Sequence, residues 1–129
     1  MRMRAAVAIL VMSMTCAGAM AGEVIAHPSV TLDSEGIREL YLGEKQFVGP
    51  LKLVPVDNVS LQREFLSNVL QTDLRTYAAR WTKKSFREGL TAPDMKGSDA
   101  EVAAFVRSTP GAVGYVGGTA TGVKVLQKF

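Results

Sequence analysis

The chain has 129 residues, of which 47% are hydrophobic and 21% are charged, as is typical of one globular domain. This composition excludes a disordered chain, and a single cysteine excludes a miniprotein held together by internal disulfides. The formal net charge of +3 would suit a nucleic-acid ligand, but two of the positive charges lie at the extreme N-terminus.

The first 21 residues have the pattern of a secretory signal peptide. Arg2 and Arg4 provide a positive start, residues 5–14 are almost entirely apolar, and Ala19-Met20-Ala21 has the small-x-small form of a signal-peptidase site. The apolar run is too short to span a bilayer, and no other stretch approaches about 20 apolar residues. We therefore expect cleavage after Ala21, a periplasmic or otherwise exported protein, and no stable membrane insertion after cleavage.

Cleavage would leave one domain, residues 22–129, with a changed charge. The loss of Arg2 and Arg4 leaves 13 basic against 12 acidic residues, a net charge of +1. Cys16 would also be lost, which suits an oxidising compartment. We therefore expect no nucleic-acid partner and no thiol chemistry.

The expected domain alternates strands and helices. A strand at 23–27 is followed by a helix with Ile37, Leu40 and Tyr41 on one face, a turn at 49–50 and a strand at 51–56. Helices are then predicted at about 60–70 and 73–86, followed by a loop at 89–97 and a helix that begins with a capping box at 98–101. Strands at 112–116 and 123–129 complete the pattern. Strands separated by helices predict an α/β fold with a mixed sheet flanked by helices.

The residues that catalysis and metal binding need are scarce. His27 is the only histidine, no serine lies in a Gly-x-Ser-x-Gly sequence, and no acidic residues have calcium-loop spacing. Composition leaves a paired-carboxylate hydrolase open, but no pair stands out. The glycines of 111–118 follow a helix and occupy a strand, whereas a dinucleotide loop leaves a strand and opens a helix. We expect neither an enzyme nor a metal or other cofactor.

One segment has a physical argument for ligand binding. Asp57-Asn58-Val59-Ser60 joins a predicted strand to a predicted helix, where unpaired amides and the helix dipole favour an anion. Asp57 could accept a proton from a protonated oxyanion such as hydrogen phosphate. The alternative is that Ser60 or Asn58 only caps the helix.

A second segment could bind a partner. Arg80, Lys83, Lys84 and Arg87 form a basic cluster around Trp81. It is either a solvated helix face with Trp81 in the core or a partner-binding patch.

Several segments, in this order and spacing, resemble the substrate-binding proteins of phosphate ABC transporters, and in particular their short, exported members. The segments are VIAHPS at 24–29, IRELYLGEK at 37–45, LVPVD at 53–57, REF at 63–65, Trp81 with Phe86, and TPGAVGYV at 109–116. The resemblance covers about 24–129 and implies one lobe of a type II periplasmic binding protein, whose full-length members close two lobes on their ligand.

The segment that would bind the ligand departs from the family. The family's Arg-Ser-Asp-Gly-Ser-Gly-Thr loop corresponds to PVDNVSL at 55–61, so Asp57 matches but Pro55 replaces the arginine and the glycines are lost.

Two functions follow from the resemblance. The first is an exported solute-binding module for phosphate or another oxyanion, with Asp57, Asn58, Ser60 and Ser29 as ligand-binding residues and an ABC transporter permease or another envelope protein as partner. The alternative is an envelope interaction or sensory accessory protein that keeps the fold but has lost small-anion binding.

Overall fold

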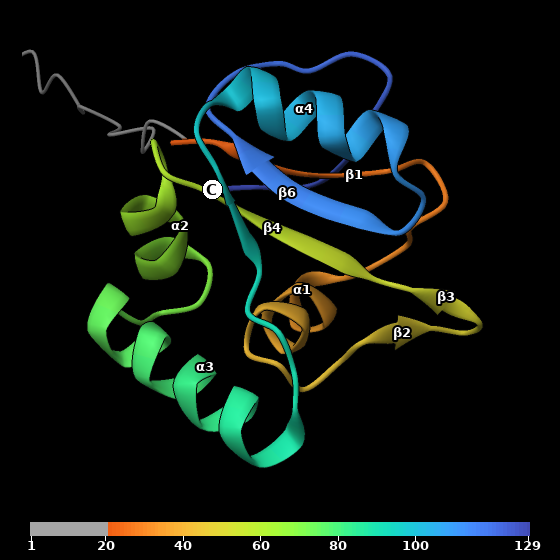
Figure 1. The fold of residues 1–129 in the computed structure, drawn as a ribbon. Helices are drawn as coiled ribbons and strands as arrows, with labels where there is room; N and C mark the ends of the chain where they lie inside the picture. The colour runs from red at the N-terminus through yellow and green to blue at the C-terminus, as the bar shows by residue number, and fades with distance from the viewer. Residues whose placement is uncertain (1–20) are drawn as a thin grey trace, which may run out of the picture.

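The computed structural model describes residues 21–129, so the predicted signal peptide lies outside the described residues except for Ala21. Five strands form a mixed sheet in the order β5-β4-β6-β1-β7 (Figure 1). β4 pairs in parallel with β5 and β6, whereas β1 pairs antiparallel with β6 and β7. The strands are β1 (Glu23–Ala26), β4 (Val54–Asn58), β5 (Asp94–Lys96), β6 (Ala112–Val116) and β7 (Lys124–Lys128).

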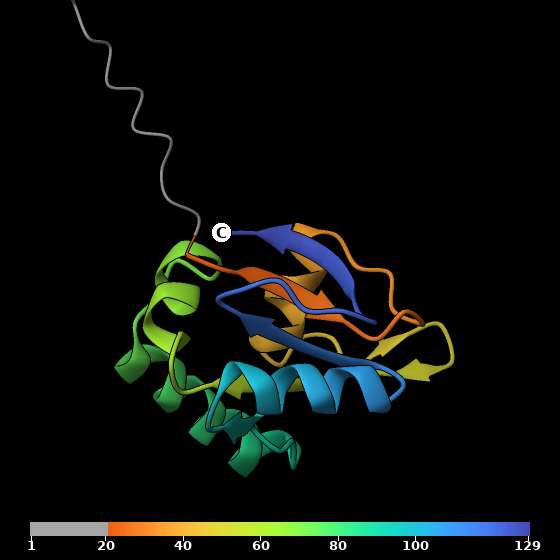
Figure 2. The same ribbon diagram turned by 90° about the horizontal axis from the view of Figure 1, so that it is seen from above.

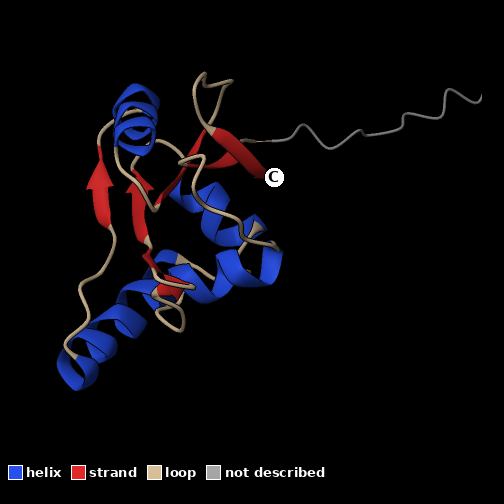
Figure 3. Cartoon of the chain, turned by 90° about the vertical axis from the view of Figure 1, so that its right-hand side faces the viewer, coloured by secondary structure: helices blue, strands red, loops and turns tan. Residues whose placement is uncertain are grey.

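Helices cover both faces of this sheet, as Figures 1 and 3 show. Three helices pack on one face, α1 (Ser34–Tyr41), α2 (Gln62–Asn68) and α3 (Leu74–Glu88), and α4 (Asp99–Ser108) packs on the other. The predicted fold class, a mixed sheet flanked by helices, is therefore confirmed. No helix within residues 21–129 has the length and apolar character needed to cross a membrane.

Three of the four helices begin at a capping side chain, and one of these caps is the predicted capping box at 98–101. Asp33 Oδ1 accepts from Gly36 N at 2.7 Å, Asp73 Oδ1 accepts from Thr76 N at 2.8 Å, and the Ser98 hydroxyl accepts from Glu101 N at 3.2 Å. These side chains satisfy amides that have no partner inside the helix.

Two segments differ from the sequence prediction. The predicted strand at 51–56 is divided into β3 (Leu51–Lys52), which pairs with β2 (Phe47–Val48) across the predicted turn, and β4. The predicted loop at 89–97 contains β5, which pairs with the outer edge of β4. Three residues are too few to show strand periodicity in the sequence. This strand forms because it pairs with β4.

The two ends of the described chain lie side by side (Figure 2). Gly22 N donates to Phe129 O at 2.8 Å and Phe129 N donates to Gly22 O at 2.8 Å. The Phe129 ring packs against Phe65, with ring centroids 5.7 Å apart. The C-terminal residue is therefore part of the core.

Candidate ligand-binding edge

Three of the four predicted ligand residues lie where the parallel strands end. Asp57 and Asn58 are the last residues of β4, and Ser60 lies in the turn that follows. Open α/β sheets bind their ligands beyond the carboxyl ends of such strands. Asp57, Asn58 and Ser60 therefore lie at the end of the sheet where a ligand site of this fold class is expected.

Asp57 points into the core. Its side chain is only 2% exposed, with Oδ2 accepting from the Tyr77 hydroxyl at 2.7 Å and Oδ1 from the Tyr115 hydroxyl at 2.8 Å. Burial raises the pKa of Asp57 to about 6, and the two tyrosine hydrogen bonds oppose that rise. Both carboxylate oxygens are therefore engaged in joining α3 to β6.

The two tyrosines act as donors. Burial, followed by the charge of Asp57, holds the pKa of both Tyr77 and Tyr115 well above its ordinary value. Their hydroxyls therefore stay protonated and donate to the carboxylate. Tyr41 also keeps its proton, because burial raises its pKa, and it donates to the carbonyls of Val56 at 2.8 Å and Val113 at 3.2 Å.

Asn58 organises the turn after β4. It is fully buried, and its Nδ2 donates to Tyr115 O at 3.0 Å and to Asp99 Oδ1 at 2.7 Å. Its Oδ1 accepts from the backbone N–H of Ser60 at 3.1 Å and from the Ser60 hydroxyl at 2.7 Å. This arrangement fixes the chain direction between β4 and α2.

The carboxylate of Asp99, at the first turn of α4, lies at the centre of this edge. Its Oδ1 lies 2.7 Å from Asn58 Nδ2 and 3.3 Å from the Ser60 Oγ, and its Oδ2 accepts from Gly117 N at 3.0 Å. Donors at the ends of β4 and β6 thus converge on the carboxylate of Asp99, which is a side chain of this protein.

The capping interpretation of the 57–60 segment is wrong. α2 begins at Gln62, not at Ser60, and its N-cap is Leu61, which has no side-chain capping hydrogen bond. Asn58 and Ser60 hydrogen-bond to each other within the turn after β4. Their side chains therefore do not cap the amides of α2.

The structure does not bring Ser29 to this group. Ser29 follows β1, which runs antiparallel to β6, so it lies at the opposite edge of the sheet. Its Oγ lies 2.7 Å from His27 Nδ1 and accepts from Gly111 N at 3.3 Å. Ser29 and His27 therefore hydrogen-bond to Gly111 and Ala112, where β6 begins.

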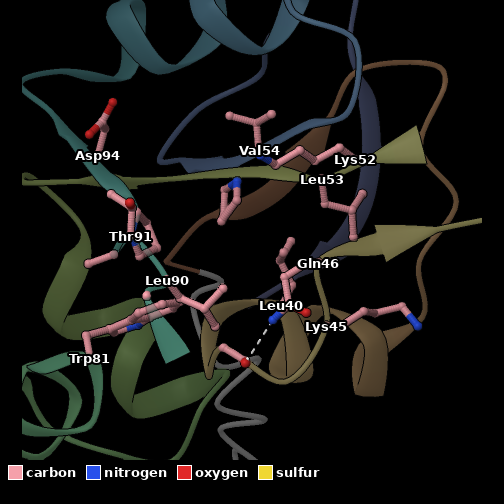
Figure 4. Close-up of a pocket in the computed structure, with 15 residues that line it drawn as sticks. Leu40, Lys45, Gln46, Lys52, Leu53, Val54, Trp81, Leu90, Thr91 and Asp94 are labelled. Atoms are coloured by element: carbon pink, nitrogen blue, oxygen red, sulfur yellow. Dashed lines mark hydrogen bonds between the residues drawn. The ribbon is translucent and has the colours of Figure 1, made fainter. Parts of the chain in front are cut away.

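A hollow of about 400 Å³ lies on the α1–α3 side of the molecule, beside Val54 and Pro55, the first residues of β4, which β5 does not pair (Figure 4). Its walls come from four separate segments, which explains why no sequence motif indicated it. The side chains are mainly apolar, with two lysines at the rim: Leu40, Leu53, Val54, Trp81, Leu90, Lys45 and Lys52. Gln46 Nε2 donates to Gly43 O at 3.0 Å and is thereby occupied.

A metal centre finds no support in the part of the chain that the structure describes. No group of three or more His, Cys, Asp or Glu residues there could hold a metal ion.

Comparisons with known proteins find the fold and nothing more specific. No family model matches the chain. No curated protein matches it either. A solved ABC-type phosphate transport receptor from Vibrio cholerae is similar, with a TM-score of 0.53 and 18% sequence identity. The match covers 84% of this chain but only 46% of the receptor. The chain therefore spans about half the length of that receptor and is similar to that part of it in fold.

Proposed function

We propose that this protein is an exported accessory module that keeps the fold of one receptor lobe and binds another protein, and that it does not capture a small anion by itself. The observation that carries this proposal is the position of Asp99. Its carboxylate accepts from the groups that an oxyanion at this edge would need: Asn58 Nδ2, the Ser60 hydroxyl and Gly117 N.

Electrostatics supports the same conclusion. A phosphate next to the Asp99 carboxylate would meet a like charge, and burying a doubly charged anion requires several free donors and a compensating cation. Asp57, the residue that matches the family's ligand loop, is committed to Tyr77 and Tyr115. The side chain that matches the family's ligand loop is therefore already engaged within the core.

A second candidate function, binding of phosphate or a similar oxyanion, is favoured by the same convergence of donors. An oxyanion that displaced the Asp99 side chain would meet Asn58, Ser60 and Gly117 N in one place. A transporter permease or a second lobe would then complete the site.

Thermal unfolding of the purified protein in phosphate or sulfate, at constant ionic strength, separates the two functions. A ligand at 100 times its Kd adds about 2.7 kcal/mol, which raises the midpoint by on the order of 10 °C for a domain of this size. We expect no rise at millimolar phosphate. A rise with phosphate but not with chloride would overturn the proposal and support the second candidate.

Replacing Asp99 tests the role of its carboxylate. Asp99→Ala leaves Asn58 Nδ2 and Gly117 N without this acceptor, whereas the Ser60 hydroxyl keeps Asn58 Oδ1, so we expect a loss of about 1–3 kcal/mol of unfolding free energy, measured in urea. Asp99→Asn is the matched control, because it retains one acceptor oxygen and should lose less. Equal stability of Asp99→Ala and the wild-type protein would show that the carboxylate does not organise this edge.

A further inference from the structure

The hollow beside the first residues of β4 has apolar walls. Leu40, Leu53 and Trp81 line it and belong to the hydrophobic core. Trp81 Nε1 donates to Tyr41 O at 3.0 Å, so the indole presents only apolar surface to the hollow. Its volume of about 400 Å³ lies within the range of small-molecule sites, roughly 300–1,000 Å³. We call it the β4 hollow.

The path of the chain after α3 creates this hollow. The helix ends at Gly89, whose φ of +68° turns the chain, and β5 begins only at Asp94. β5 pairs with Val56–Asn58 and leaves the first two residues of β4 without a neighbour on that side. Residues 89–93 and the start of β4 therefore face each other across the hollow without pairing.

Two exposed side chains of opposite charge line the β4 hollow. They are Lys52 on β3 and Asp94 on β5, and Figure 4 shows them on opposite sides of it. Within residues 21–129 neither forms an ion pair, whereas Lys45, the other lysine at the rim, lies 4.0 Å from Glu39 Oε2. The rim thus has one uncompensated cation and one uncompensated anion, separated by apolar surface.

We propose that the β4 hollow binds a short apolar peptide with free termini, its carboxylate at Lys52 and its ammonium group at Asp94. A free peptide has these two charges at its ends, and apolar side chains between them would match the walls. This inference goes beyond the proposed function and is independent of it, because none of Asp57, Asn58, Ser60 and Asp99 lines this hollow.

Charge and polarity favour this occupant over three others. An apolar carboxylic acid would leave Asp94 unmatched, and an apolar amine would leave Lys52 unmatched. Inorganic phosphate has no apolar surface to place against Leu53 and Trp81. An internal segment of another protein has no terminal charges and would engage neither rim residue.

The test titrates the purified protein with the dipeptide Leu-Leu and follows the fluorescence of Trp81, the only tryptophan of the chain, with calorimetry as a second readout. We expect saturation with a Kd below about 1 mM, as for a small ligand of modest efficiency. Gly-Gly, which has the same charges and no apolar side chain, should not bind. N-acetyl-Leu-Leu and Leu-Leu amide should each bind about three- to fivefold more weakly, since an exposed ion pair contributes modestly.

Two variants assign the ends of the peptide. Lys52→Gln should weaken Leu-Leu about three- to fivefold and leave the affinity for Leu-Leu amide unchanged, because that ligand has no carboxylate to lose. Asp94→Asn should weaken Leu-Leu to the same extent and leave the affinity for N-acetyl-Leu-Leu unchanged. A structural effect of either substitution would weaken all three ligands alike.

Matched controls lie outside the β4 hollow. Lys83→Gln changes an exposed lysine that lines a different hollow of about 260 Å³, and Glu64→Gln changes an exposed carboxylate on α2. Phe86→Ser alters the neighbouring hollow of about 860 Å³, which Trp81 also lines, and so tests whether the fluorescence reports on the wrong side of α3. All three variants should bind Leu-Leu as the wild-type protein does.

Several results would overturn this inference. They are an absence of fluorescence change and heat with Leu-Leu up to 10 mM, equal affinity for free and blocked peptides, and wild-type affinity in both Lys52→Gln and Asp94→Asn. Weaker binding to Phe86→Ser alone would place the ligand in the neighbouring hollow and also count against it. Stabilisation in phosphate, which overturns the proposed function, leaves this titration unaffected.

Discussion

At the scale of single residues, Asp57 makes the unfolding free energy depend on pH. Its pKa of about 6 in the folded protein lies above the value of about 3.9 in an unfolded chain. The folded state therefore binds the proton more tightly, and the contribution of this group is fully present below pH 4 and lost as the pH rises through 6. The difference of about two units corresponds to a loss of about 3 kcal/mol.

Comparison with Asp57→Asn isolates this contribution, because asparagine has the same shape and does not titrate. The unfolding free energy of the wild-type protein minus that of Asp57→Asn should fall by about 2 kcal/mol between pH 4 and pH 7, measured by urea denaturation. Asp94→Asn, at an exposed carboxyl group, serves as the control. A difference that stays constant across this range would show that Asp57 is not titrating in the folded protein.

The residue scale also shows how far sequence reasoning could reach. Asp57, Asn58 and Ser60 were placed correctly at one edge of the sheet, because a polar run after a buried strand marks a strand end. Their partners Tyr115 and Asp99 lie 58 and 41 residues further along the chain from Asp57 and Asn58. Only the pairing of β4 with β6 and the packing of α4 bring these groups together, and neither is encoded in local spacing.

At the scale of elements, Gly111 sets the start of β6. Its φ of +82° disfavours any side chain, and a Cβ there would lie 2.1 Å from the carbonyl oxygen of Lys52. Its own carbonyl accepts from Val54 N at 2.9 Å, which aligns β4 with β6. Gly111→Ala should therefore lower the unfolding free energy by more than about 2 kcal/mol in urea denaturation.

Gly118→Ala is the matched control, because a Cβ at Gly118 meets nothing within 4 Å and its φ is not positive. Its stability should stay within about 0.5 kcal/mol of the wild-type value. Equal effects of the two substitutions would mean that the close approach of Gly111 to Lys52 does not constrain the sheet.

The elements that sequence reasoning placed best are those with local signals. The starts of α1, α3 and α4 follow capping residues, Asp33, Asp73 and Ser98, which act within one turn. The sequence did not indicate β5, because this strand depends on its tertiary pairing with β4. It placed the start of α2 too early, because the Asn58 turn delays that helix. Leu74 shares a helical face with Tyr77 and Trp81 by its spacing and is nevertheless 43% exposed, since periodicity describes an apolar face but not whether another element covers it.

At the scale of the whole molecule, the two ends stabilise each other. Phe129 contacts Phe65 and Tyr115, with ring centroids 5.7 and 6.3 Å apart. Phe129→Ala should cost about 3 kcal/mol of unfolding free energy, as for other buried aromatic side chains. Val125→Ala, at a half-exposed position of β7, the strand that Phe129 follows, should cost less than about 1 kcal/mol. Similar losses in the two variants would show that Phe129 packs no better than a surface residue.

The hydrogen bonds between Gly22 and Phe129 have a consequence for how this lobe can be connected. A short linker between residues 22 and 129 would close the chain into a ring without breaking the sheet, and new ends could be opened in the exposed turn at 118–121. For the same reason the lobe could be inserted into a loop of a host protein, because both junctions would meet the host at a single point.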